Sequence, residues 1–188
     1  MGLAVGIYGV PGVGKSTLTR RLVSVRRDLR QILGSAVVRE VIAPASFDDL
    51  DRWSPARREA VRDAAIERLE VERRAFDGLL LVDGHFSLRN RRTGVLESVI
   101  GDTDRNFYDA WVLIDSTPEQ VVVQRVGDGD RCRGDDVDEV HEHLLLERSL
   151  AEATHRLTGR PVHVVSAPSV DARADDVLRF LDSLRGGA

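Results

Sequence analysis

The residues best suited to chemistry lie in one glycine-rich stretch near the N-terminus, residues 9–16, with the sequence GVPGVGKS. It fits the pattern G-x-x-x-x-G-K-[ST] of the phosphate-binding P-loop. Its glycines let successive backbone N–H groups surround an anion, and the following helix adds the positive end of its dipole. Lys15 can reach the outer phosphates of a nucleotide, and the Ser16 hydroxyl can ligate Mg²⁺. The predicted ATP-binding residues are Gly9, Pro11, Gly12, Val13, Gly14, Lys15, Ser16 and Thr17.

Lys15 is also the only lysine in the chain, because all other long basic side chains are arginines. This indicates that position 15 requires a slim ammonium group, which a planar guanidinium cannot replace. The single lysine also excludes the Asn-Lys-x-Asp guanine signature of a GTPase.

A second group of candidate residues follows the apolar run Leu79–Val82, which ends in Asp83. A continuous apolar run of this length is typical of a central parallel strand buried on both faces. Ligands of such sheets bind at the carboxyl ends of the strands, so Asp83 is expected beside the P-loop. We expect it to hold Mg²⁺ together with Ser16, through a water molecule; the alternative is a capping or ion-paired acid. His85 in the same loop is either a substrate contact or a structural histidine.

Strand and helix patterns alternate along the chain, which predicts an α/β fold. We expect a P-loop NTPase three-layer sandwich with a five-stranded parallel sheet and a short lid. The expected strands are residues 3–8, 36–42, 79–83, 111–115 and 161–166, and the expected helices are 17–27, 55–76, 118–126, 137–158 and 171–184. Residues 88–103 are expected to form a loop and a short helix. Glu40 would then end the second strand and face the ligand.

Length and composition suggest one globular domain over residues 1–188. The net charge of −4 shows no basic excess of the kind that nucleic-acid binding requires. No apolar run reaches the length of a membrane span, and the N-terminus begins directly with a strand. We therefore expect a cytoplasmic protein that binds neither membranes nor nucleic acid. An acceptor-binding insert is expected at about residues 43–76, and a glycine-rich lid at about residues 127–136.

Three segments resemble the archaeal-type adenylate kinases: GVPGVGKST at 9–17, LVDGH at 81–85 and DRCRGD at 130–135. The resemblance covers most of the chain. It implies Mg²⁺-dependent phosphoryl transfer from ATP to a nucleoside monophosphate, with AMP favoured, and an oligomeric protein. It also implies that the lid arginines Arg125, Arg131 and Arg133 act with Lys15 in catalysis by closing over the transferring phosphate.

The same comparison shows departures that concern the acceptor. Gly84 stands where the family has Thr, the run FSLRNRR follows His85, and Gly134 interrupts the arginine element of the lid. The predicted acceptor-binding residues are Glu40, Phe47, Trp53, His85 and Arg89. Three alternatives remain open: a kinase of a nucleoside or small hydroxyl metabolite, a nucleotide-dependent assembly ATPase, and a passive nucleotide-binding module. Dependence of steady-state turnover on a small acceptor would separate them.

Overall fold

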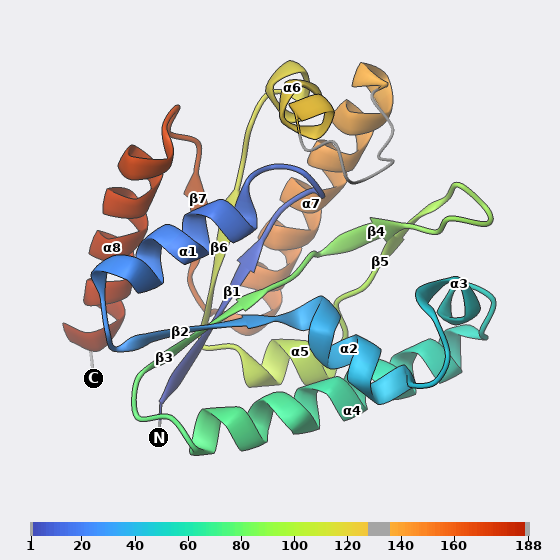
Figure 1. Ribbon diagram of the computed structural model, residues 1–188, viewed down its shortest axis with the longest axis horizontal. Helices are drawn as coiled ribbons and strands as arrows, with labels where there is room; N and C mark the ends of the chain where they lie inside the picture. The colour runs from blue at the N-terminus through green and yellow to red at the C-terminus, as the bar shows by residue number, and fades with distance from the viewer. Residues whose placement is uncertain (1, 128–135, 187–188) are drawn as a thin grey trace.

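The protein is built around a five-stranded parallel sheet (Figure 1), seen in a computed structural model that describes residues 2–127 and 136–186. The strands, in spatial order, are β2 (Leu29–Leu33), β3 (Leu79–Asp83), β1 (Leu3–Tyr8), β6 (Ala110–Ile114) and β7 (Val162–Val165). Neighbouring strands all run in the same direction. The α/β fold with a five-stranded parallel sheet is therefore confirmed.

Helices cover both faces of this sheet and make three layers (Figure 1). On one face lie α1 (Lys15–Val25) and α8 (Val170–Gly186), and on the other lie α2 (Gly34–Ile42), α4 (Pro55–Arg74) and α5 (Asp102–Phe107). The central strands show why the sheet needs both layers. Leu79 and Leu81 of β3 belong to the first hydrophobic core, whereas Leu80 and Val82 belong to the second. Because alternate residues point to opposite faces, a strand buried on both sides is apolar throughout.

Helix α7 (Val137–Thr158) begins near the carboxyl edge of the sheet and runs along its second face, where Ala151 joins the second core (Figure 1). The other elements lie around the carboxyl edge. They are the single turn α3 (Phe47–Leu50), α6 (Pro118–Gly127) and the antiparallel hairpin of β4 (Ser87–Arg89) and β5 (Leu96–Ser98). Helix α7 has the bounds expected from the sequence, with Asp136 as N-cap and Gly159 in a left-handed C-cap. The hairpin differs from the loop expected at its position. None of the helices in the described ranges is both long and apolar enough to cross a membrane.

The expected strand at residues 36–42 is wrong, because these residues belong to helix α2. The second strand is instead β2, which pairs with β3 from Leu29↔Leu79 to Leu33↔Asp83. Helix α2 buries Val37 and Ile42 and packs against α4. A short run rich in valine and isoleucine fits either a strand or a helix face, and tertiary packing decided in favour of the helix.

Candidate active site

The glycine-rich segment forms a tight turn between the end of β1 and the start of α1. Gly9 and Gly14 adopt φ values of 144° and 97°, in a region that side chains with a Cβ rarely enter. A Cβ on Gly9 would also lie 2.7 Å from the backbone oxygen of Ile114. Six of the eight predicted ATP-binding residues line a cavity: Pro11, Gly12, Gly14, Lys15, Ser16 and Thr17. The other two, Gly9 and Val13, support the turn from its inner side.

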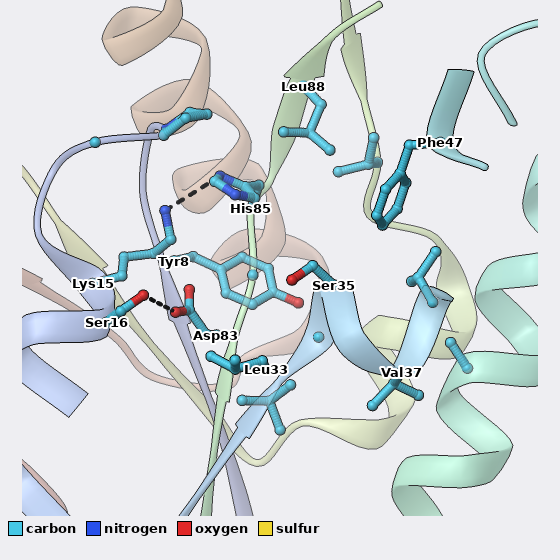
Figure 2. A pocket seen from close by; sticks show the side chains of 18 of the residues that line it. Tyr8, Lys15, Ser16, Leu33, Ser35, Val37, Phe47, Asp83, His85 and Leu88 are labelled. Atoms are coloured by element: carbon cyan, nitrogen blue, oxygen red, sulfur yellow. Dashed lines mark hydrogen bonds between the residues drawn. The ribbon is translucent and has the colours of Figure 1, made fainter. Parts of the chain in front are cut away.

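The ammonium group of Lys15 lies across this turn. Its Nζ donates to the backbone oxygens of Gly9 at 2.7 Å and Val10 at 3.1 Å, and the residue is 7% exposed. Nζ also lies 3.4 Å from Nδ1 of His85 (Figure 2). A charged phosphate oxygen is a stronger acceptor than a neutral carbonyl, so the same ammonium is positioned to bind nucleotide phosphates.

Ser16 and Asp83 form a second pair of groups at the same end of the cavity (Figure 2). Asp83 ends β3, which pairs with β1 through Ile7↔Asp83, so its carboxylate lies beside the P-loop. The Ser16 hydroxyl donates to Oδ2 of Asp83 at 2.9 Å. A hydroxyl and a carboxylate are hard oxygen ligands, as Mg²⁺ prefers. Among the described residues there is no cluster of three or more His, Cys, Asp or Glu that could enclose a metal. The pair therefore fits a magnesium ion that takes its other ligands from water and substrate phosphates.

His85 connects the loop after β3 to the P-loop. Its Nδ1 lies 2.7 Å from the backbone oxygen of Gly9 and donates to it in the tautomer that carries the proton on Nδ1. The side chain also lines the cavity, and its predicted contact with a substrate stays a prediction. It holds the P-loop in place and faces the space where a substrate would bind.

A buried carboxylate that the sequence analysis missed anchors this same loop. Glu147 of α7 is 1% exposed and accepts from the backbone N–H and hydroxyl of Ser87 at 2.6 and 2.7 Å. It also accepts from the N–H of Phe86 at 3.3 Å. Burial raises the pKa of Glu147 above 4.5, and the hydrogen bonds from Ser87 oppose that shift. Beside it, Nε2 of His143 donates to the Ser87 oxygen at 3.1 Å, and burial lowers the pKa of His143 to about 4.

Two arginines hold the outer side of the P-loop. Nε of Arg125, a predicted lid residue, donates to the backbone oxygen of Pro11 at 3.0 Å. Arg173 of α8, which the sequence analysis missed, donates to the backbone oxygens of Val13 at 3.2 Å and Ala167 at 2.6 Å. Burial lowers the pKa of Arg173 below its usual range. The predicted lid residues Arg131 and Arg133 lie outside the described residues, as does most of the expected lid.

The cavity has a volume of about 910 Å³ and extends from the P-loop to α2, α3, α4 and the β4–β5 hairpin. Figure 2 shows Lys15, Ser16 and Asp83 at one end, and Phe47 and Val37 at the other. Phe47, His85 and Arg89 line this cavity, and their predicted contact with an acceptor stays a prediction. Arg89 is turned toward Gly94 and Glu142, to which it donates at 2.6 and 3.0 Å.

Two other predicted acceptor residues lie away from the cavity. Glu40 is on helix α2, its side chain is 64% exposed, and it pairs with Arg68 at 3.5 Å. Its predicted position at a strand end is therefore wrong, because residues 36–42 form a helix. Trp53 is not among the lining residues in the described ranges. Its ring is covered by the guanidinium of Arg57 at 3.6 Å.

One group of cavity residues was not predicted from the sequence. It lies on the inner face of α4 and on the elements opposite that face. Four charged residues there line the cavity: Arg58, Arg62, Glu97 and Asp104. The arginine- and glutamate-rich pattern of α4 indicated a solvated outer face. It gave no indication that Arg58 and Arg62 line a cavity. They become cavity residues only because β5 and α5 fold over them.

Comparisons with known proteins agree with this arrangement. A family model described as an AAA domain matches residues 8–143. Two relatives named adenylate kinase each align over 160 residues. The one from Pyrococcus abyssi is 26% identical and the alignment covers 81% of this chain and 80% of the relative. The one from Thermococcus onnurineus is 29% identical, with 80% and 79% covered. The resemblance to the adenylate kinases is thereby confirmed.

Solved structures share the fold over nearly the whole chain. A gluconokinase from Sinorhizobium meliloti 1021 matches with a TM-score of 0.60 and 17% identity, over 97% of this chain and 93% of that one. A sugar kinase from Janibacter sp. HTCC2649 matches with a TM-score of 0.60 and 14% identity, over 97% and 95%. At these identities the likeness shows the fold alone.

Proposed function

The chain belongs to the AAA-domain family and is a P-loop kinase related to the adenylate kinases; on this premise we propose that it transfers the γ-phosphoryl group of Mg·ATP to a nucleoside monophosphate. AMP is the first acceptor to test, because two relatives that align with about four fifths of this chain are named adenylate kinase.

The observation that carries this proposal is the continuity of the cavity. Lys15, Ser16 and Asp83 lie at its phosphate-binding end, and the same space continues past Tyr8 to the chamber between α2, α3 and α4. A second chamber that opens onto the phosphate-binding end gives room for a second substrate. A phosphoryl transferase needs one, because donor and acceptor must meet in line with water excluded.

In the proposed reaction, a phosphate oxygen of the acceptor attacks the γ-phosphorus of ATP. The bond from that phosphorus to the β,γ-bridging oxygen breaks, and ADP leaves. An anionic phosphate is nucleophilic enough that no side chain has to remove a proton. The residues therefore act by positioning and by charge. Lys15 would bind the outer phosphates. Arg125, with Arg131 and Arg133, would offset the charge that moves.

Ser16 and Asp83 would hold the magnesium ion, Asp83 through water. When bound, the ion neutralises charge on the β- and γ-phosphates. The single domain over residues 1–188 would then comprise the core, an acceptor-binding insert at about 43–76 and a lid at about 127–136. The observed helices α3 and α4, which wall the cavity, support the placement of the insert. The oligomer implied by the resemblance stays a prediction.

A second candidate is a kinase of a small hydroxyl acceptor, such as a nucleoside or a sugar acid. The carboxylates of Glu97 and Asp104 line the acceptor chamber and could accept hydrogen bonds from hydroxyl groups. The similar structures are titled gluconokinase and sugar kinase, although their likeness shows fold alone. A hydroxyl nucleophile benefits from a base, and Asp83 is a carboxylate in contact with the phosphate loop through Ser16.

The test is ADP formation from Mg·ATP against a panel of acceptors: none, the four common nucleoside monophosphates, their nucleosides, and D-gluconate. Strong stimulation by AMP, with two ADP formed per turnover, is expected. Stimulation only by a nucleoside or gluconate would contradict the monophosphate proposal and favour the second candidate. Slow ATP hydrolysis that no acceptor stimulates would instead favour a nucleotide-dependent assembly ATPase.

A further inference from the structure

The acceptor chamber contains two arginines, Arg58 and Arg62, that each have a donor which the described protein does not use. Arg58 and Arg62 are four residues apart on α4, so their side chains leave the same face of the helix. Both line the cavity. In each, Nε is buried and has no hydrogen-bond partner among the described residues. Buried donors in native proteins are almost always paired, so these Nε atoms mark two guanidinium groups that the described protein does not fully satisfy. Because both residues line the cavity, a ligand there would meet their outer nitrogens.

The other arginines that line this cavity show the contrast. Each of them donates to a described partner: Arg20 to the Ser16 oxygen, Arg89 to the Gly94 oxygen, Arg91 to Asp48 and Arg173 to the Val13 oxygen. Arg58 also has one partner, since its Nη1 donates to Glu97 of β5. Within residues 2–127 and 136–186, Arg62 is thus the cavity arginine that makes no hydrogen bond or ion pair.

Two acids near these arginines define what the chamber can bind. Glu97 is occupied by Arg58 and so fixes that guanidinium against the hairpin. Asp104 is buried and its Oδ2 accepts from the Gly101 N–H at 2.9 Å, so this oxygen serves as a helix cap. Burial raises the pKa of Asp104, and the positive charge of Arg62 opposes that rise. Asp104 therefore acts on Arg62 through its charge and not through a hydrogen bond between these two described residues, so the donors of Arg62 stay available to a ligand.

Apolar side chains from α2, α3 and α4 make up much of the remaining chamber wall. They include Val37, Val38, Phe47, Leu50, Val61 and Ile66. Tyr8 and Tyr108 also line the cavity, and their rings pack edge to face with centroids 5.7 Å apart. The chamber therefore suits a ligand with an apolar or planar body and one acid group. A guanidinium fork matches the two oxygens of a phosphate or a carboxylate.

We infer that Arg62, assisted by Arg58, binds an acid group of the phosphoryl acceptor, and that an acceptor without such a group is a poor substrate. This inference rests on the proposed function, since it takes the chamber as the acceptor site. The acid group is either the phosphate of a nucleoside monophosphate or the carboxylate of a sugar acid. A neutral nucleoside does not meet the requirement.

The experiment is calorimetric titration of AMP, D-gluconate and adenosine into the full chain, with the P-loop saturated by AMP-PNP and Mg²⁺. The variants are Arg62→Gln and Arg62→Lys. The matched control is Arg68→Gln, on the same helix, whose side chain is 66% exposed and lies outside the cavity lining. We expect at least one acid probe to bind the wild type and to bind Arg62→Gln about tenfold or more weakly. Arg62→Lys should fall between the two, and the control should match the wild type.

The identity of the affected probe distinguishes a phosphate from a carboxylate. Adenosine should bind wild type and Arg62→Gln alike. The melting temperature of Arg62→Gln should stay at or above that of the wild type, because the substitution removes an unpaired buried donor. A structural arginine would instead lower it. The inference is overturned if neither acid probe binds the wild type, if Arg62→Gln binds both as the wild type does, or if adenosine weakens equally.

The binding titration and the turnover assay can fail separately, so the subsite and the proposed reaction are tested apart. Unchanged acid binding in Arg62→Gln, together with acceptor-stimulated ADP formation, would contradict the Arg62 subsite and support the proposed kinase reaction. Weakened acid binding in Arg62→Gln, without ADP formation that an acceptor stimulates, would support the subsite and contradict the proposed reaction.

Discussion

Replacement of Glu147 by alanine should destabilise the protein more than any exposed substitution on the same helix. The carboxylate is 1% exposed and accepts three hydrogen bonds, from the Ser87 N–H and hydroxyl and the Phe86 N–H. Each buried donor left without a partner costs about 1–3 kcal/mol. Because the serine hydroxyl can rotate toward another acceptor, we count the two backbone donors and expect a loss of about 2–6 kcal/mol of unfolding free energy.

Glu147→Gln should have a smaller effect. Its side-chain oxygen can still accept from Ser87. Its amide group, however, faces the Phe86 N–H, and because both groups are donors they cannot form a hydrogen bond. The neutral side chain also avoids the cost of burying a charge, so we expect a loss of about 1–2 kcal/mol. The matched control is Glu152→Ala on α7, where an exposed pair with Arg156 is worth less than about 1 kcal/mol.

The assay is urea unfolding followed by far-ultraviolet circular dichroism, with equal m values as the condition for comparing free energies. Hydrogen exchange at the Phe86 and Ser87 amides should speed up in Glu147→Ala. The next residue toward the P-loop is His85, so its contact with Gly9 should loosen and turnover should fall as well. A Glu147→Ala protein within about 0.5 kcal/mol of wild type would refute the reasoning, because the loop would then not depend on this carboxylate.

The remaining predictions concern the metal, the pH dependence and the back of the P-loop. Chelation with EDTA should abolish turnover, and Asp83→Asn should raise the Mg²⁺ concentration for half-maximal activity about 10- to 100-fold; an unchanged requirement would contradict the assignment of Asp83. Unfolded His143 takes up a proton below pH 6.5, whereas folded His143 stays neutral to about pH 4. The unfolding free energy should therefore fall by about 3 kcal/mol as the pH drops from 7 to 4, relative to His143→Gln measured in parallel; parallel pH curves would contradict this. Arg173→Leu should raise the KM for ATP, since Val13 loses a donor that fixes the P-loop, and a normal KM would show that the loop holds its shape alone.

Much of the fold could be predicted from residue patterns. The P-loop motif fixes the order strand, loop and helix, and the apolar runs that end in Asp83 and Asp115 are buried strands because helices cover both faces. The pairing of Ser16 with Asp83 followed from placing both at the carboxyl edge of one sheet. These predictions depend on local sequence and on one topological rule, so they needed no knowledge of side-chain packing.

The misses all depend on contacts between distant segments. Residues 36–42 carry apolar side chains that suit either a strand or a helix, and packing against α4 decides between them. Arg58 and Arg62 look like two more surface arginines of a charged helix until β5 and α5 enclose them. Glu147 is one acid inside an apolar stretch of α7, and its role appears only when the loop after β3 presents unpaired N–H groups to it.

The central claim, that the P-loop and the adjoining chamber together transfer a phosphoryl group, is tested most directly by acceptor-dependent ADP formation in wild type and Lys15→Ala. We predict that AMP strongly stimulates ADP formation by the wild type. Lys15→Ala, with an unchanged circular dichroism spectrum, should be slower by about a hundredfold or more, because the transferring charge loses its ammonium partner. Equal rates in the two proteins, or wild-type ADP formation that no acceptor changes, would contradict the account.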